Sequence, residues 1–121
     1  MIYHIASRQA WLAAQERGWY SAPTLTSDSF IHCSKRDQVL RVANDFYGGG
    51  ANLLLLCIDE SKLKAELRWE APAHPDSDVA MATSSVGLFP HLYGQLNLDA
   101  VVQAVEFRNS DGGFALPADL P

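Results

Sequence analysis

Three of the four histidines of this chain stand among apolar residues, and their side chains are the ones best suited to carry chemistry. These are His4, between Tyr3 and Ile5, His32, between Ile31 and Cys33, and His91, between Pro90 and Leu92. An imidazole with a pKa of about 6.5 can donate a proton, accept one or bind a metal near neutral pH. The sequence therefore predicts His4, His32 and His91 as the catalytic residues of one candidate site.

Strand geometry predicts that two of these histidines face the same groove. Residues 2–5 and 30–34 both have a β-like composition, and successive side chains of a strand point to opposite faces. If the apolar neighbours of His4 and His32 point into the core, the two imidazoles point out of it on the other face. We expect His4 and His32 to line one pocket, with His91 close to it.

A metal site is an alternative interpretation of the same three residues. Three histidines can bind zinc and leave a fourth position open, as in hydrolytic enzymes. His4, His32 and His91 are spread over the whole chain, however, with no HxH or HExxH spacing. No metal ligand is therefore predicted, and a zinc-dependent hydrolase stays only as an alternative function.

The other reactive side chains have simpler interpretations. Cys33 follows His32 directly, so the two point to opposite faces of a strand and do not form a nucleophile–base pair. Glu70 and Asp99 are candidates for a general base or a ribose contact. The alternation of residues 66–70 favours a solvated strand position for Glu70, and Asp99 is expected to start or cap the last strand.

Length and composition are those of one small domain. The chain has 121 residues, of which 48% are hydrophobic and 19% charged, and its net charge is −5. This acidic balance argues against a nucleic-acid partner, and the longest apolar run, residues 53–58, is too short for a bilayer.

Cys33 and Cys57 lie in apolar surroundings without CxxC spacing, which favours free thiols in a reducing compartment. With no signal-peptide pattern at residues 1–5, we expect a cytoplasmic protein, and the oligomeric state is left open.

The periodicity of the apolar residues predicts an α+β fold. Ser7 caps a helix over residues 8–17 that Gly18 ends. Ser34 caps a second helix, which has an apolar stripe at positions 39, 42, 43 and 46 and ends at the glycines 48–50. Strands are predicted at residues 2–5, 30–34, 53–58, 66–70 and 100–107, with 53–58 central and with Leu67 and Trp69 pointing inward. The irregular stretch 71–88 is predicted to be mobile or functional. These elements predict a single domain, residues 1–121, with a bent or split antiparallel sheet and two main helices.

The two helix N-termini supply the predicted ligand-binding residues. Each helix begins shortly after a histidine, where free N–H groups and the helix dipole can hold a phosphate. Arg8, Lys35 and Arg36 are expected on the first helical turns, where they add positive charge. Ser34 and Tyr93 each follow a candidate histidine by two residues. Ser34, Tyr93, Lys35 and Arg36 are therefore predicted to bind a small-molecule ligand.

Two sequence blocks, FIHCS at residues 30–34 and FPHLYG at residues 89–94, are specific enough to indicate a family. With Ile2–Ile5, Val42–Asn44, Leu54–Asp59 and the Trp69-Glu70 pair, they make nearly the whole chain resemble the bacterial domain of unknown function family 952. That family has no established activity. Its proposed wider kinship is with the ADP-ribosyltransferase-like fold, which binds NAD in a cleft between two small antiparallel sheets.

The resemblance implies roles for the candidate residues. His4 would correspond to the first-strand residue that contacts the adenosine ribose and the nicotinamide amide. The segment with His32 and Ser34 would correspond to the strand whose aromatic residue stacks on nicotinamide. The final motif normally offers a glutamate, and between Phe89 and Val102 this chain has none, which favours binding over transfer.

The resulting hypothesis is that the chain binds or processes a nucleotide-type ligand, such as NAD or ADP-ribose, in a histidine-lined cleft. It would then be an ADP-ribosyltransferase-like enzyme or a degenerate relative, with NAD as a candidate substrate and no other cofactor. The alternatives are a non-catalytic module that binds a small anion or a peptide, and the zinc-dependent hydrolase.

Overall fold

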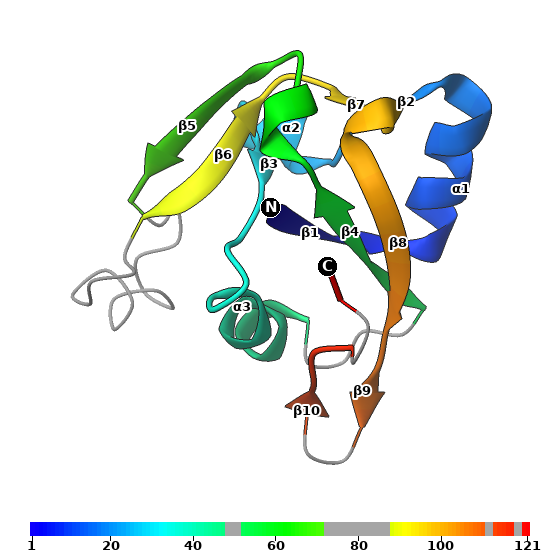
Figure 1. The fold of residues 1–121 in the computed structure, drawn as a ribbon, viewed down its shortest axis with the longest axis vertical. Coiled ribbons are helices and arrows are strands. Elements are labelled where there is room, and N and C mark those ends of the chain that lie inside the picture. Colours follow the sequence, from blue (N-terminus) through cyan, green and yellow to red (C-terminus); the bar gives the residue numbers. More distant parts are fainter. Residues whose placement is uncertain (48–51, 72–87, 111–112, 118–119) are drawn as a thin grey trace.

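Two three-stranded antiparallel sheets form the framework of the chain. The structure, a computed structural model, describes residues 1–47, 52–71, 88–110, 113–117 and 120–121 (Figure 1). The first sheet has the order β1 (Ile2–Ser7), β4 (Leu53–Ile58), β8 (Val101–Phe107), and the second the order β3 (Ile31–His32), β6 (Phe89–Tyr93), β5 (Glu66–Glu70). Two shorter pairs join β2 (Trp19–Tyr20) to β7 (Leu96–Asn97) and β9 (Asn109–Ser110) to β10 (Gly113–Phe114). Antiparallel sheets with few helices confirm the predicted α+β class.

A single backbone bridge joins the two larger sheets. Tyr3 of β1 and Ser34, which lies just beyond β3, exchange two N–H···O hydrogen bonds of 2.8 Å. Before Ser34, Ile31 and His32 pair with β6 instead of β1, so in the described part of the chain this ladder consists of the Tyr3–Ser34 bridge alone. The sheet is therefore split at this bridge, as the sequence predicts.

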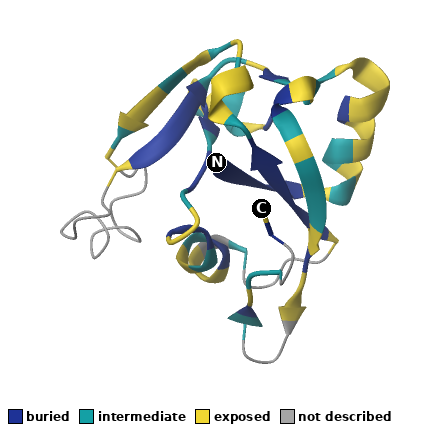
Figure 2. Ribbon diagram, viewed as in Figure 1, coloured by how far each residue is buried: buried dark blue, intermediate teal, exposed yellow. Residues whose placement is uncertain are grey.

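The core lies on both faces of the first sheet. All six residues of β4 are buried, because β1 and β8 flank this strand and apolar side chains cover both of its faces (Figure 2). One cluster takes Leu54, Leu56 and Ile58 together with residues from β1 and from the second sheet. The other takes the alternate residues of β4 and packs them against α3 (Val39–Phe46) and β10. The prediction of a central strand at residues 53–58 is thus confirmed.

Helix α1 (Arg8–Arg17) begins and ends at the predicted residues. The backbone N–H of Ala10 donates to Ser7 Oγ at 3.0 Å, which satisfies one of the free N–H groups of the first turn. Gly18 has φ +99°, a left-handed conformation in which glycine is favoured, and its N–H donates to the Ala14 carbonyl at 2.8 Å. Ala14 is the buried residue that packs α1 on the sheet.

Helix α3 begins later than the sequence predicts, at Val39 instead of directly after Ser34. Ser34 is not the cap, because its backbone pairs with Tyr3. Gln38 holds the turn before the helix instead: its Oε1 accepts from the Lys35 N–H at 2.9 Å, and its Nε2 donates to the Leu88 carbonyl at 2.7 Å. The helix ends at residue 46, and the glycines predicted to end it lie outside the described residues.

The remaining elements are short, and one prediction about them is wrong. They are the helix α2 (Thr24–Ser27) and the 3₁₀ turns η1 (Glu60–Lys62) and η2 (Leu98–Ala100). In β5, Leu67 packs against the core as predicted, but Trp69 is 41% exposed. β5 is the edge strand of its sheet, and Trp69 borders an open groove on the surface instead of the core. Residues 72–87 of the predicted irregular stretch lie outside the described residues.

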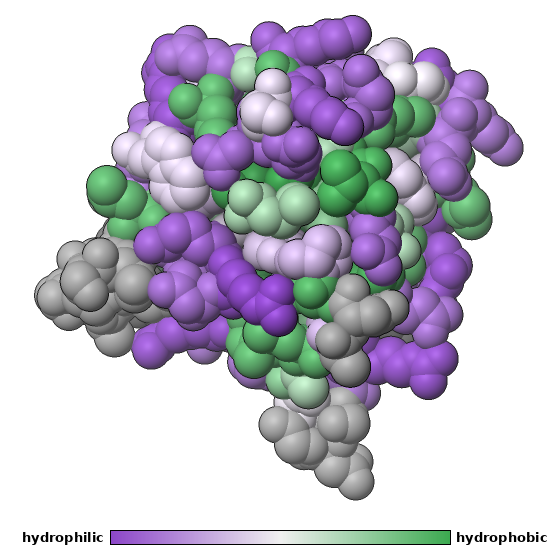
Figure 3. All heavy atoms as spheres, viewed as in Figure 1, coloured by the Kyte–Doolittle hydropathy of each residue, from purple (hydrophilic) through white to green (hydrophobic). Residues whose placement is uncertain are grey.

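The surface carries polar side chains around scattered apolar ones. In the view of Figure 3, hydrophilic residues cover most of the rim, and hydrophobic residues gather nearer the middle of the face. Among the described residues, none of the helices is both long enough and apolar enough to cross a bilayer.

Candidate functional site

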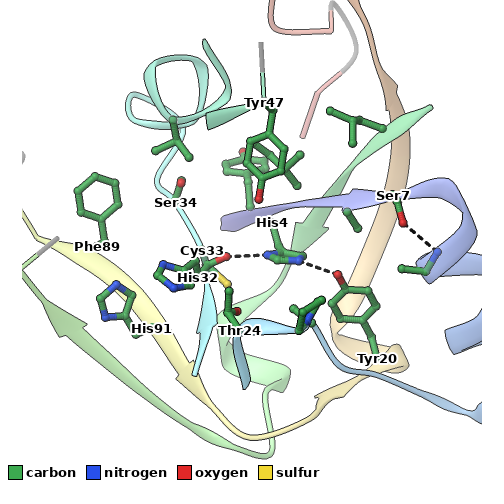
Figure 4. Close-up of a pocket in the computed structure, with 18 residues that line it drawn as sticks. His4, Ser7, Tyr20, Thr24, His32, Cys33, Ser34, Tyr47, Phe89 and His91 are labelled. Atoms are coloured by element: carbon green, nitrogen blue, oxygen red, sulfur yellow. Dashed lines mark hydrogen bonds between the residues drawn. The ribbon is translucent and has the colours of Figure 1, made fainter. Parts of the chain in front are cut away.

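A cavity of about 520 Å³, here called the β1 cavity, lies beside β1 at the place where the two larger sheets meet (Figure 4). Its wall comes from β1, residues 20–24, residues 32–34, α3 and β6, with smaller contributions from α1 and β4. The wall is mainly apolar. His4, His32 and His91 all line it, as does Ser34, so the structure brings the three predicted histidines to one cavity.

His4 is held by two hydrogen bonds to other parts of the chain. Its Nδ1 lies 2.6 Å from the His32 carbonyl oxygen, and its Nε2 lies 2.8 Å from the Tyr20 hydroxyl. Because a carbonyl oxygen only accepts, Nδ1 carries the proton, and Nε2 accepts from Tyr20. Figure 4 shows the ring between these two partners. His4 therefore ties β1 to both β2 and β3.

Burial fixes the charge of His4 as well as its position. The side chain is 5% exposed, and burial lowers its pKa to about 4, with the hydrogen bond to the His32 carbonyl opposing that shift only in part. The ring is therefore neutral at pH 7. Both ring nitrogens of His4 are engaged in this structure, and the catalytic role predicted for it stays a prediction.

His91 is oriented by a carboxylate. Its Nδ1 lies 2.9 Å from Glu70 Oε1, and the same oxygen accepts a hydrogen bond of 2.6 Å from the Tyr93 hydroxyl. The ring of Phe30 stacks on the imidazole at a centroid distance of 4.1 Å. Burial lowers the pKa of His91, and the hydrogen bond to Glu70 opposes this shift. His91 is thus a buried imidazole with a fixed ring plane.

His32 has a carboxylate partner of its own. Its Nε2 lies 2.8 Å from Asp28 Oδ2, in the turn before β3. His32 and His91 are directly opposite each other in the β3–β6 ladder, and their ring centroids are 5.5 Å apart. Phe30 touches both rings. The second sheet therefore presents two carboxylate–imidazole pairs side by side at the cavity.

The ladder of β1 leaves the backbone of Ile5 facing the cavity side. In antiparallel pairing, the N–H and C=O groups of alternate residues point to opposite neighbours. Tyr3 uses both groups for Ser34, so Ile5, two residues further on, turns its own N–H and C=O away from β4. Within the described ranges no hydrogen bond reaches Ile5 from that side, and Ile5 lines the cavity. The cavity thus contains a backbone donor and acceptor open to a ligand.

Two hydroxyl groups add polar character to the apolar wall. Among the described residues, Thr24 Oγ1 is the fully buried side-chain polar atom that has no hydrogen-bond partner. A buried polar atom in this state costs about 1–3 kcal/mol, which a ligand or a water molecule in the cavity would offset. The Tyr47 side chain points from α3 toward His4 (Figure 4), and burial raises the pKa of its hydroxyl, which keeps it protonated.

Lys35 and Arg36 lie outside the β1 cavity, so the placement predicted for them is wrong. They stand on the turn that precedes α3 instead of its first helical turn, and they border a separate surface groove with Trp69. Arg36 donates to the carbonyl oxygens of Leu120 and Pro121 at 3.4 and 3.2 Å. In the described part of the chain, no lysine or arginine lines the β1 cavity. A role for Lys35 and Arg36 in ligand binding stays a prediction, separate from the histidines.

The other candidate residues have simpler placements. Tyr93 does not line the cavity; its hydroxyl donates to Glu70, which is the partner of His91. Cys33 lines the cavity, but burial raises the pKa of its thiol to about 12, so it is protonated. Asp99 lies on the surface, where it accepts from Asn97 Nδ2 at 2.6 Å. Over the described ranges, no group of three or more His, Cys, Asp or Glu side chains is placed to hold a metal ion.

Three partners of the histidines were not identified as such from the sequence: Tyr20, Asp28 and Glu70. Glu70 is a general-base candidate in the sequence, although the alternation of its strand favours a solvated position. The same alternation places Glu70 on one face with Glu66 and Arg68, and the ladder sets Arg68 opposite His91. A prediction of the β5–β6 register would therefore have found this partner. Tyr20 and Asp28 lie in the segment 19–29, which is rich in Ser, Thr and Pro. This segment has no helix or strand periodicity from which their positions could be predicted.

Two of three comparisons with known proteins find a similar family or structure. The model of the family described as "Protein of unknown function (DUF952)" matches residues 5–104. A crystal structure of protein CC0527 from Caulobacter crescentus is similar to this chain, with 31% identity, a TM-score of 0.77, and coverage of 93% of this chain and 90% of that one. The solution NMR structure of CC0527 has 32% identity, a TM-score of 0.71, and coverage of 93% and 89%. Comparison with curated proteins gives no match. With its family model matched over residues 5–104, this chain belongs to the DUF952 family of proteins of unknown function.

Proposed function

We propose that the β1 cavity binds the uncharged, ring-bearing part of a nucleotide-type ligand of the NAD and ADP-ribose class. The observation that carries this proposal is the open N–H and C=O pair of Ile5 at the cavity wall. A carboxamide, or the amide-like edge of a base, presents a matching acceptor and donor. Such a ligand satisfies both backbone groups at once.

The size and character of the cavity support a small organic ligand. A volume of about 520 Å³ falls within the usual range for ligand pockets, which are mainly apolar with a few placed polar groups. Here those groups are the Ile5 backbone and the hydroxyls of Ser34, Thr24 and Tyr47. The cavity also lies between two small antiparallel sheets, which is the place that the resemblance to the ADP-ribosyltransferase-like fold implies for NAD.

The charges of the wall favour a ring over a phosphate. His4 is neutral, and His32 and His91 are each paired with a carboxylate. With no lysine or arginine from the described residues on the wall, phosphate groups of a nucleotide would remain outside the cavity. The small-anion alternative lacks a partner for the same reason. A peptide strand is also disfavoured, because the open edge of β1 is limited to Ile5 between the Tyr3 bridge and the start of α1.

Calorimetry with matched ligands tests this proposal. Nicotinamide, adenosine and NAD are expected to bind, with nicotinamide near the millimolar affinity that suits so small a ligand. Nicotinic acid is expected to bind at least tenfold more weakly, because its carboxylate would face the Ile5 carbonyl oxygen and offer no donor. Equal affinity for nicotinamide and nicotinic acid would contradict the role given to Ile5.

A pair of variants separates cavity binding from surface binding. Val42→Phe on α3 narrows the cavity and is expected to weaken nicotinamide binding at least tenfold, since Val42 lines the wall. Val102→Phe makes the same chemical change at a residue of β8 that is 45% exposed, and it should leave binding unchanged. Absence of binding of nicotinamide, adenosine, NAD and ADP-ribose by the unmodified chain would reject the proposed function.

A further inference from the structure

We propose that Glu70 and His91 form a proton-accepting dyad, which takes a proton from a water molecule or a ligand hydroxyl group in the β1 cavity. The inference rests on the proposed function for the place where a ligand binds, and it adds a chemical activity to that site. The substrate class is a small uncharged molecule with an electrophilic carbon, such as an ester or a glycoside.

The first step is the tautomer of His91. Glu70 Oε1 accepts a hydrogen bond from the Tyr93 hydroxyl and lies 2.9 Å from His91 Nδ1. A carboxylate oxygen only accepts, so Nδ1 of the neutral ring carries the proton and Nε2 carries the lone pair. This is the arrangement by which a carboxylate prepares an imidazole as a base in hydrolytic enzymes.

The second step is access to Nε2. No hydrogen bond joins this nitrogen to another described residue. Among the described residues, Thr24 Oγ1 is the fully buried side-chain polar atom without a hydrogen-bond partner. His91 Nε2 has no partner among these residues either but is not fully buried. His91 Nε2 therefore keeps contact with accessible space, although the side chain as a whole is 3% exposed. Since His91 lines the β1 cavity and Glu70 engages its Nδ1, we infer that Nε2 is the ring nitrogen available to a ligand there.

The third step is the rigidity of the dyad. The Phe30 ring stacks on the imidazole at 4.1 Å and 25° between planes. The Tyr93 hydroxyl fixes the carboxylate of Glu70 at 2.6 Å, and the guanidinium of Arg68 lies 4.2 Å from the centre of the Tyr93 ring. A base held in this way loses little orientational freedom when it acts, which favours proton transfer.

Burial keeps His91 neutral at pH 7 against the carboxylates that face it. The facing groups are Glu70 and Arg68 from β5, His32 from β3, Asp28 from the preceding turn and Tyr93 from β6 itself. Burial lowers the pKa of His91 and has a larger effect than the hydrogen bond to Glu70, which raises it. At pH 7 the lone pair on His91 Nε2 is therefore available to accept a proton.

The proton-transfer step is balanced for an ester. As the oxygen of a water molecule bonds to the carbonyl carbon, its proton moves to His91 Nε2. The bond from that carbon to the leaving oxygen then breaks, and its electron pair stays on the leaving oxygen. His91 returns the proton to that oxygen or to solvent, so the dyad is regenerated and the products are an acid and an alcohol.

Hydrolysis of p-nitrophenyl acetate is the direct test, because this planar, uncharged ester is small enough for the cavity. The unmodified chain is expected to release p-nitrophenol faster than buffer does. His91→Gln should reduce the rate to the buffer value. Glu70→Gln should lower the rate about tenfold or more, because it removes the carboxylate that holds the proton on Nδ1. Asp99→Asn, the same type of change at a surface carboxylate outside the cavity, should have no effect. Circular dichroism of each variant shows whether it is folded.

A second measurement on the unmodified chain does not depend on any variant. Nitrogen NMR of the histidine rings at pH 7 is expected to show His91 neutral with the proton on Nδ1. A charged ring, a proton on Nε2, or an ester rate equal to that of His91→Gln would each overturn the dyad. Because the ester probe contains no nucleotide, loss of NAD binding with retained ester hydrolysis would reject the proposed ligand alone, and the reverse outcome would reject the dyad alone.

Discussion

Replacement of His4 should remove a specific part of the pH dependence of folding. In the native state burial lowers the pKa of His4 to about 4, whereas in the unfolded chain an exposed imidazole has a pKa of about 6.5. The unfolded state therefore binds more protons between these values, and stability falls as the pH falls through this window. Each unit of pKa difference corresponds to about 1.4 kcal/mol. The native chain should thus lose about 2 kcal/mol from this one group between pH 8 and pH 5, and about 3 kcal/mol below pH 4.

Urea unfolding of the chain and of His4→Asn measures this contribution, with the fluorescence of the three tryptophans as the signal. Asparagine keeps a donor for the His32 carbonyl but does not titrate. The other ionisable groups are common to both proteins, so they cancel in the difference of unfolding free energies. That difference is expected to shrink by about 2 kcal/mol from pH 8 to pH 5. A difference that stays constant with pH would refute the buried, neutral state of His4.

Three further substitutions test the local contacts that hold the site. Tyr20→Phe keeps the buried ring but leaves His4 Nε2 without its donor, and it should lower the free energy of unfolding by about 1–3 kcal/mol in the same urea assay. Ser7→Ala removes the side-chain acceptor for the Ala10 N–H, and thermal unfolding should show a loss of about 1 kcal/mol. Gln38→Leu removes partners of two backbone groups at once, so a loss of less than about 1 kcal/mol would contradict its assigned role.

Those parts of the fold that depend on local rules could be predicted from the sequence. Both ends of helix α1 are predicted correctly, because Ser7 and Gly18 form their capping hydrogen bonds with residues three or four positions away. The position of β4 followed from six consecutive apolar residues. The start of α3 was wrong because it depends on a distant contact: Gln38 reaches the carbonyl of Leu88, and no local pattern distinguishes that glutamine from the serine expected to cap the helix.

The candidate site was predictable in its histidines and not in their partners. Apolar neighbours and strand alternation were enough to select His4, His32 and His91, which the structure brings to one cavity. Their different states could not be read from the sequence, since His4 and His91 have similar neighbours in the chain. Tyr20 occupies the second nitrogen of His4, whereas Glu70 leaves the second nitrogen of His91 accessible. Each difference comes from a residue that only the folded topology brings near.

The split between the two sheets explains two features of the site. It leaves the backbone of Ile5 unpaired on the cavity side in the described part of the chain, and it leaves His4 to join β1 and β3 through its side chain. Because the Tyr3–Ser34 bridge is antiparallel, the residue opposite Ile5 would be His32, and a ladder that extended to His32 would pair with Ile5 and close the cavity. Ile31 and His32 pair with β6 instead, and the Cys33 N–H donates to the Pro90 carbonyl oxygen. With the ladder cut short at that bridge, the hydrogen bond from His4 to the His32 carbonyl supplies a side-chain tie between the strands. The residues that limit pairing between the two sheets are therefore the same ones that keep the cavity available for a ligand.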